Sequence, residues 1–464
     1  MLKLALTGSI STIMQNILLT VFFVILARVY QPVEFAQYLT GNSLYQLFAA
    51  LSTLGLGQWF SREILQQDNS LLLMQKYFKV QLLLGIVVYL LSGLAVFLLY
   101  RTYPLSVVCL LCCSNIMVDN WIDAFKNLNV ATENQKRNFS ILLIDAFVRC
   151  LLAGMLLIAP VNVMWLCLVL LGVRLSTLVL FYRYGGFNSK WLADILKARI
   201  TFFNIRELVL KNFYFAVIGG ISVVYWRSGN IVVSKLLEPI DLAYFEIAFK
   251  VFVLFQVFPL IFSSVVFPKF VANIRDGDRS GLFSLYRNTY LLYLGFGICA
   301  YTFVYLLADT FVPLAFGKTY TYAAHYVKIM LLVILFFPTA FLQANLLVAL
   351  GRERDDMVIN LVTLVVYGLS ILMGFQYARS LEVIVYSIVF SWILFHLIQD
   401  IYLLRAGFTD IRSMLVSNAL ILGWIFTLYF SERLFSKIYL SVFLGIALGA
   451  VLISGRNRIR NMFG

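Results

Sequence analysis

Charged residues are scarce in this chain. Only 12% of its 464 residues are Asp, Glu, Lys or Arg, and 62% are hydrophobic. Soluble proteins carry about twice this share of charge. No soluble fold could hide so much apolar surface, which excludes a soluble enzyme, a secreted disulfide scaffold and a disordered chain.

Histidine and cysteine are also few, with two and six residues. The cysteines lie within apolar runs. Cys109, Cys112 and Cys113 lack the histidine or second cysteine pair that a metal site would need. We therefore interpret the cysteines as small buried hydrophobic residues and expect neither a metal nor a cofactor.

Long apolar runs dominate instead. A spanning helix needs about 20 residues. The first run follows Lys3 but is too long for a signal peptide and shows no cleavage site, so we expect it to stay as a membrane helix. The runs predict fourteen spans at 5–28, 38–59, 79–100, 104–123, 140–159, 162–182, 208–227, 242–267, 288–308, 325–350, 358–377, 382–404, 413–430 and 438–455.

The positive charges follow the parity of the loops. The net charge is +14, which in a soluble protein would suggest nucleic acid as a partner. When basic residues near the ends of spans are counted with the adjoining loops, 24 of the 36 Lys and Arg residues lie at the two termini or in even-numbered loops, 9 lie in odd-numbered loops and three lie within spans. This asymmetry predicts that both termini are cytosolic, and it removes the reason to expect a nucleic-acid partner.

The longest loop, 183–207, contains a short amphipathic stretch. Trp191 and Ile195 share one face at helical spacing, as do Leu192 and Leu196. This pattern predicts an interfacial helix on the cytosolic leaflet. No other loop is as long, so we expect no extramembrane catalytic domain.

An internal repeat relates the two halves of the sequence. A shift of 207 positions places Arg28 on Lys235, Pro32 on Pro239 and Glu34 on Asp241. Six predicted spans separate the copies, so the copies have the same orientation and form two lobes related by an axis along the membrane normal. The proline and the following acid also suit the start of a helix. The predicted domains are an N-terminal six-helix lobe (1–183), a cytosolic amphipathic linker (184–207), a C-terminal six-helix lobe (208–405), and two accessory helices with a basic tail (406–464).

Four basic residues within or at the end of spans are candidate substrate contacts. A cation at mid-bilayer costs about 3 kcal/mol or more, so it usually faces a wet cavity or a partner. Asp145 precedes Arg149 by one turn and Glu246 precedes Lys250 by one turn, so each pair either neutralises itself or faces a cleft. Arg174 has no acid nearby in the sequence, and we expect it to face a cavity. The fourth is Arg227, at the end of the seventh span; together the four would favour an anionic passenger.

Polar uncharged side chains within spans are a weaker signal. Asn42 and Gln46 could bind sugar hydroxyls or ions, or could join helices to one another. Asp145 and Glu246 are further candidates for such contacts. His396 and Asp400 lie one turn apart, where they form either a structural pair or a proton relay.

One stretch near the N-terminus resembles a family signature. It reads Ala27-Arg28-x-x-x-Pro32-x-Glu34-Phe35-Ala36-x-Tyr38, then Leu54-Gly55-Leu56-Gly57 and Arg62-Glu63. It is similar to the N-terminal motif of Wzx-type polysaccharide (O-antigen) repeat-unit flippases, within the multidrug/oligosaccharidyl-lipid/polysaccharide exporter superfamily. That family usually has Gly where this chain has Ala36.

The resemblance implies a transporter of the bacterial inner membrane and no catalytic residues. Its substrate would be undecaprenyl-diphosphate-linked oligosaccharide, moved by alternating access of the two lobes, for O-antigen or another surface polysaccharide. An ion gradient or the membrane potential would drive the movement, and a polysaccharide polymerase would be a partner. Three alternatives stay open: a cation-coupled multidrug exporter of the same superfamily, a polytopic polymerase or glycosyltransferase, and a membrane scaffold.

Overall fold

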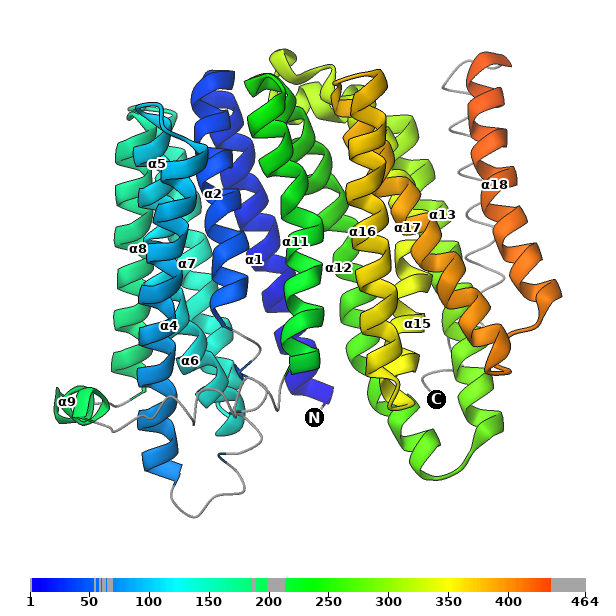
Figure 1. Ribbon diagram of the computed structural model, residues 1–464, viewed down its shortest axis with the longest axis horizontal. Helices are drawn as coiled ribbons and strands as arrows, with labels where there is room; N and C mark the ends of the chain where they lie inside the picture. The colour runs from blue at the N-terminus through cyan, green and yellow to red at the C-terminus, as the bar shows by residue number, and fades with distance from the viewer. Residues whose placement is uncertain are drawn as a thin grey trace. The chain divides into compact units, whose positions relative to one another are not determined.

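The computed structural model describes residues 2–53, 56, 57, 60, 64, 70–185, 189–197 and 213–434, and this part of the chain contains helices and turns but no strand (Figure 1). It forms two compact units, residues 1–243 and 244–464. The helices of the first unit are α1 (Leu2–Val29), α2 (Pro32–Ser52), α4 (Ser70–Leu99), α5 (Leu105–Cys113), α6 (Asn115–Ala131), α7 (Gln135–Leu156), α8 (Val163–Tyr184), α9 (Ser189–Lys197) and α11 (Phe213–Leu236). From α12 (Pro239–Arg275), within which the second unit begins, the chain continues through α13 (Arg279–Phe316), η1 (Lys318–Tyr320), α14 (Ala323–Met330), η2 (Leu331–Leu335), α15 (Phe337–Ala349), α16 (Glu353–Tyr377), α17 (Leu381–Arg405) and α18 (Ile411–Leu434).

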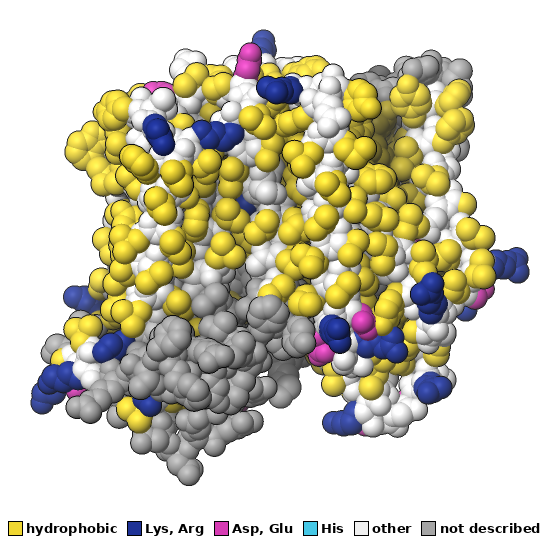
Figure 2. Space-filling view, in the orientation of Figure 1, with side chains coloured by type: hydrophobic (Ala, Val, Ile, Leu, Met, Phe, Trp, Pro, Cys, Tyr) yellow, Lys and Arg dark blue, Asp and Glu magenta, His cyan; other side chains and the backbone are white. Residues whose placement is uncertain are grey.

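Most of these helices are suited to a membrane. Among the residues that the structure describes, eleven helical stretches are long and apolar enough to cross one. Eleven of the first thirteen predicted spans each coincide with one helix in the described residues, whereas the fourth covers α5 and α6 and the tenth covers α14, η2 and α15. The fourteenth, 438–455, lies outside the described residues. Figure 2 shows hydrophobic side chains along the middle of the helices, with most visible Lys and Arg near the helix ends. The predicted all-α polytopic membrane fold is confirmed.

The repeated proline motif marks two equivalent helix starts. Pro32 is the first residue of α2 and Pro239 is the first residue of α12. Glu34 and Asp241 lie in the first turns of these helices, where a carboxylate interacts favourably with the helix dipole. The prediction that the proline and the following acid mark the start of a helix is therefore confirmed. The rotation that would relate the two lobes stays a prediction.

Helix α11 packs within the first unit, against α2. The buried Asn230 amide donates to Ser43 Oγ at 2.8 Å, and the Tyr100 and Ser234 hydroxyls are 2.6 Å apart. The repeat assigned this helix to a C-terminal lobe beginning at residue 208, whereas the contacts group it with the first unit. The domain boundaries derived from the repeat therefore remain predictions: 1–183, 184–207, 208–405 and 406–464.

The predicted amphipathic segment is a helix, α9, that is bound to the first unit. Trp191 and Ile195 are both buried, and the Trp191 ring packs edge-on against Phe78 at 5.0 Å. Lys79 Nζ donates to the Leu196 carbonyl at 2.7 Å. The shared face of Trp191 and Ile195 therefore packs against protein.

The tenth predicted span is broken in the structure. Between α14 and α15 the backbone forms the 3₁₀ helix η2 instead of an α-helix, and Pro338 lies in the first turn of α15. Proline lacks the N–H that a continuous α-helix would need at this point. Helix α13 passes very close to η2 at Gly297, where a Cβ atom would lie 2.7 Å from the Ile334 carbonyl oxygen.

Candidate functional site

Four charged side chains meet inside the first unit, and we call Asp119, Asp145, Arg149 and Arg174 the charge cluster. Arg174 Nε on α8 lies 2.7 Å from Asp119 Oδ1 on α6. A second nitrogen of Arg174, Nη1, lies 3.4 Å from Asp145 Oδ1 on α7. Arg149 Nε, one turn after Asp145, lies 2.9 Å from Asp145 Oδ2. The cluster therefore joins three helices through a chain of alternating charges.

Two hydroxyl groups complete the cluster. The buried Thr177 hydroxyl on α8 donates to Asp145 Oδ1 at 2.7 Å. The Tyr45 hydroxyl on α2 donates to Asp119. Because Tyr45 comes from a fourth helix, movement of α2 against α6 would alter the surroundings of Asp119.

The cluster has no net charge, and its members are largely removed from solvent. The Arg149 and Arg174 side chains are 17% and 20% exposed, and the carboxylates are less exposed still. Removing one partner from a buried pair leaves an uncompensated charge, which costs about 3–5 kcal/mol. Arg174 also forms a hydrogen bond with the Tyr45 hydroxyl. A guanidinium has five N–H donors, more than the contacts of Arg174 with Asp119, Asp145 and Tyr45 require. Arg174 is thus fixed in place and retains donors for a ligand.

Of the predicted site residues, the structure brings Asp145, Arg149 and Arg174 together. Sequence reasoning missed Asp119, the partner of Arg174, because α6 and α8 are far apart in the sequence. A signal was present, since Asp119 falls within the predicted span 104–123 and an acid in a span needs a partner.

The other candidate residues lie elsewhere. Asn42 and Gln46 are half-buried on α2. Asn42 is three residues from Tyr45, so the side chains of Asn42 and Tyr45 are neighbours on one helix face. Arg227 is half-buried on α11. In the second unit, Glu246 is buried and Lys250 is half-buried on α12, one turn apart. That these residues share a cleft with the charge cluster stays a prediction.

The second unit has a buried polar group around Asp400 on α17. Its carboxylate accepts from the Gln343 amide on α15 at 2.6 Å and from the Asn418 amide on α18 at 3.0 Å. His396 Nε2 lies 3.3 Å from Asp400 Oδ2. Two helices thus hold the carboxylate in place, an arrangement that suits the structural interpretation of the His396–Asp400 pair.

Comparison with known families identifies the chain. The model of the polysaccharide biosynthesis protein family matches residues 2–273, which is more than half of the sequence. The chain belongs to this family. The family resemblance seen in the sequence is thereby confirmed. No curated protein sequence matches the chain.

Solved structures share the fold of this polysaccharide biosynthesis protein. An inward-facing multidrug resistance MATE family transporter of the MOP superfamily has a TM-score of 0.72 and 13% identity, over 89% of this chain and 96% of that one. The lipid II flippase MurJ, in an inward closed conformation, has a TM-score of 0.66 and 14% identity, over 98% of this chain and 99% of the flippase. At these identities the similarity shows the fold alone. Together with the apolar helices, it makes the chain a multi-pass membrane protein.

Proposed function

We propose that this membrane protein is a transporter rather than an enzyme, a flippase that moves undecaprenyl-diphosphate-linked oligosaccharides outward across the bacterial inner membrane. The observation that carries the proposal is the pair of half-buried arginines, Arg149 and Arg174, within a polysaccharide biosynthesis protein. The fold shared with a lipid II flippase supports it. The product would supply O-antigen or another surface polysaccharide, and a polysaccharide polymerase would be the partner that receives it.

The charge cluster suits a diphosphate passenger. Moving phosphate charge through a layer of low dielectric requires a counter-charge and hydrogen-bond donors. Guanidinium groups supply both, because their planar donors match the geometry of phosphate oxygens. Asp119 and Asp145 would hold the arginines when no substrate is bound, and the diphosphate would compete for the same donors.

The remaining candidates have complementary roles in this scheme. Arg227 and Lys250 would contact the anionic substrate at other depths, and the amides of Asn42 and Gln46 would contact sugar hydroxyls. Rocking of two lobes would alternate access, driven by an ion gradient or the membrane potential without a cofactor. Both termini would be cytosolic, so a reporter active only outside the cytosol should be silent when fused after residue 464.

The test measures flipping of a lipid-linked oligosaccharide in proteoliposomes at equal protein content. We expect Arg174→Lys to retain part of the activity and Arg174→Ala to lose most of it. Arg183→Ala is the matched control, because Arg183 is exposed on the same helix. The double variant Asp119→Asn/Arg174→Gln removes both charges of the pair, so it should fold and still fail to transport.

The possible failures of this test are distinguishable. Normal transport by Arg174→Ala or by the double variant would exclude Arg174 as a substrate contact but leave the flippase assignment standing. If the wild-type protein moves no lipid-linked oligosaccharide, the flippase assignment itself is wrong.

The alternative function, cation-coupled multidrug export, is favoured by the MATE fold. Such a protein should hold an unpaired acid at mid-span. In the structure Asp119 and Asp145 pair with arginines, and Asp400 accepts from two amides. The buried Asp356 lies in the first turn of α16, where the helix dipole stabilises a carboxylate. Export of a cationic dye from the same proteoliposomes would support this alternative.

A further inference from the structure

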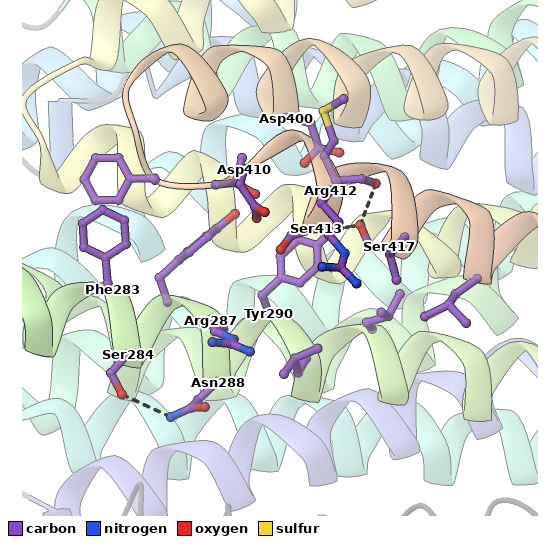
Figure 3. Close-up of a pocket in the computed structure, with 18 residues that line it drawn as sticks. Phe283, Ser284, Arg287, Asn288, Tyr290, Asp400, Asp410, Arg412, Ser413 and Ser417 are labelled. Carbon is purple, nitrogen blue, oxygen red and sulfur yellow. Dashed lines mark hydrogen bonds between the residues drawn. The ribbon is translucent and has the colours of Figure 1, made fainter.

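A cavity of about 920 Å³ lies between α13 and α18 in the second unit (Figure 3). Tyr290 on α13 donates to Ser417 Oγ on α18 at 3.2 Å, which joins the two helices across the cavity. Phe283 and Phe408 stack at 5.0 Å and line another part of it. The cavity therefore has fixed walls from both helices, and it is separate from the charge cluster of the first unit.

Two arginines from different helices line this cavity. Figure 3 shows Arg287 on α13 and Arg412 on α18, both extending into the space between the helices. Both side chains are exposed. Within the part of the chain that the structure describes, no carboxylate lies within ion-pair distance of Arg287 or Arg412, although the charge of Asp410 interacts with Arg412 over a longer distance. Two guanidinium groups therefore border one space.

Carboxylates also line the cavity, and they restrict the ligand. Asp400 is buried and already accepts from Gln343 and Asn418. Asp410 is exposed at the start of α18, and a hydrogen bond with Ser413 holds its pKa below the usual value. Asp410 is therefore ionised at neutral pH. A simple anion would satisfy the arginines but would be repelled by the negative charge of Asp410 beside it.

Part of the lining is apolar and faces outward. Leu291 on α13 and Val416 and Leu420 on α18 are all exposed large hydrophobic residues that line the cavity. Their exposure suits contact with an acyl chain. The polar and apolar parts of the cavity thus match a ligand with a charged head and a hydrocarbon tail.

We expect the polar end of the cavity to lie at the depth of lipid headgroups. The apolar stretch of α18, Ile411–Phe430, is 20 residues long and therefore about 30 Å in length, close to the thickness of the hydrocarbon core. Arg412, the second residue of α18, must then lie at its edge. The predicted loop parity places this edge on the cytosolic side.

We infer that this cavity binds a glycerophospholipid of the cytosolic leaflet with a zwitterionic, primary-amine headgroup. The phosphate lies between Arg287 and Arg412, the ammonium interacts with Asp410, and an acyl chain follows Leu291 and Leu420. This lipid is a resident ligand, distinct from the transported substrate.

The first test measures the lipid that stays bound to the full chain purified in mild detergent, by native mass spectrometry and lipid analysis. The wild type should retain a phosphatidylethanolamine-type lipid, and Arg287→Ala or Arg412→Ala should lower its retention about tenfold, as expected for a lost charge-assisted contact. The matched controls are Arg279→Ala and Arg405→Ala, two exposed arginines close by that do not line the cavity. Equal losses in these controls would overturn the proposal.

The second test measures headgroup preference in nanodiscs that contain ethanolamine, choline or glycerol phospholipids. Asp410→Asn preserves a good helix cap. It should keep the lipid but lose the preference for ethanolamine over choline. Three outcomes would overturn the proposal: preferential retention of the glycerol phospholipid, retention of the polyprenyl carrier lipid instead, or displacement by millimolar inorganic phosphate, which would indicate a simple anion site.

Discussion

Arg174 on α8 and Asp119 on α6 form a 2.7 Å ion pair inside the first unit. The residues are distant in the sequence, and neither has a helix neighbour that could replace its partner fully. Arg174 retains a longer contact with Asp145, and Asp119 retains the Tyr45 hydroxyl. The pair therefore acts as a joint between helices as well as a candidate anion site.

The first prediction concerns the stability of this joint. Arg174→Gln alone leaves Asp119 buried without its cation and should destabilise the protein by about 3–5 kcal/mol. Adding Asp119→Asn removes that charge, so the double variant should recover about 2 kcal/mol relative to the sum of the single variants. Thermal unfolding in detergent measures all three. Strict additivity would show that the two charges do not interact.

A second prediction uses two glycines on α13. The Cβ atom of Gly297→Ala would press on the Ile334 carbonyl oxygen, and we expect a loss of about 1–3 kcal/mol. Gly295, half a turn earlier, has open space around it, so Gly295→Ala should leave stability unchanged or raise it by about 0.5–1 kcal/mol. The same unfolding measurement compares the two. If both substitutions had the same effect, the close approach of α13 to η2 would be disproved.

A third prediction tests what holds α9. Trp191 is buried against Phe78 and Phe125, and truncating a buried tryptophan costs about 3–5 kcal/mol. Trp191→Ala should therefore release α9, which hydrogen exchange of residues 189–197 would detect. Leu196→Ala is the control, because Leu196 is 56% exposed. If only lipid contact held this helix, Leu196→Ala would release it as readily.

The sequence predicted those features that depend on neighbouring residues. Hydropathy placed most of the spans, and the proline motif placed the starts of α2 and α12. The spacing of Asp145 and Arg149 allowed either a pair or a cleft-facing arginine, and the structure shows the pair at 2.9 Å. All of these follow from the geometry of one helix and its ends.

Features that depend on which helices meet could not be predicted. Asp119 reaches Arg174 only because α6 packs on α8, and Gln343 and Asn418 reach Asp400 from α15 and α18. Hydropathy does not encode these neighbours, because every spanning helix is apolar on most faces. The break at η2 was missed for a similar reason, since its residues, Leu331–Leu335, are as apolar as a continuous span.

The last prediction distinguishes the two interpretations of His396 and Asp400. If the pair is structural, Asp400→Asn places an amide donor among the Gln343 and Asn418 donors, leaving polar groups unsatisfied in a buried site at a cost of about 1–3 kcal/mol. The protein should then unfold at a lower temperature, while the folded fraction transports at a normal rate across pH. A proton relay would give the opposite pattern, with little change in stability and loss of the response to a proton gradient. Measuring transport per folded molecule at several pH values, beside thermal unfolding, separates these outcomes, and we expect the structural one because two neighbouring helices already hold the carboxylate.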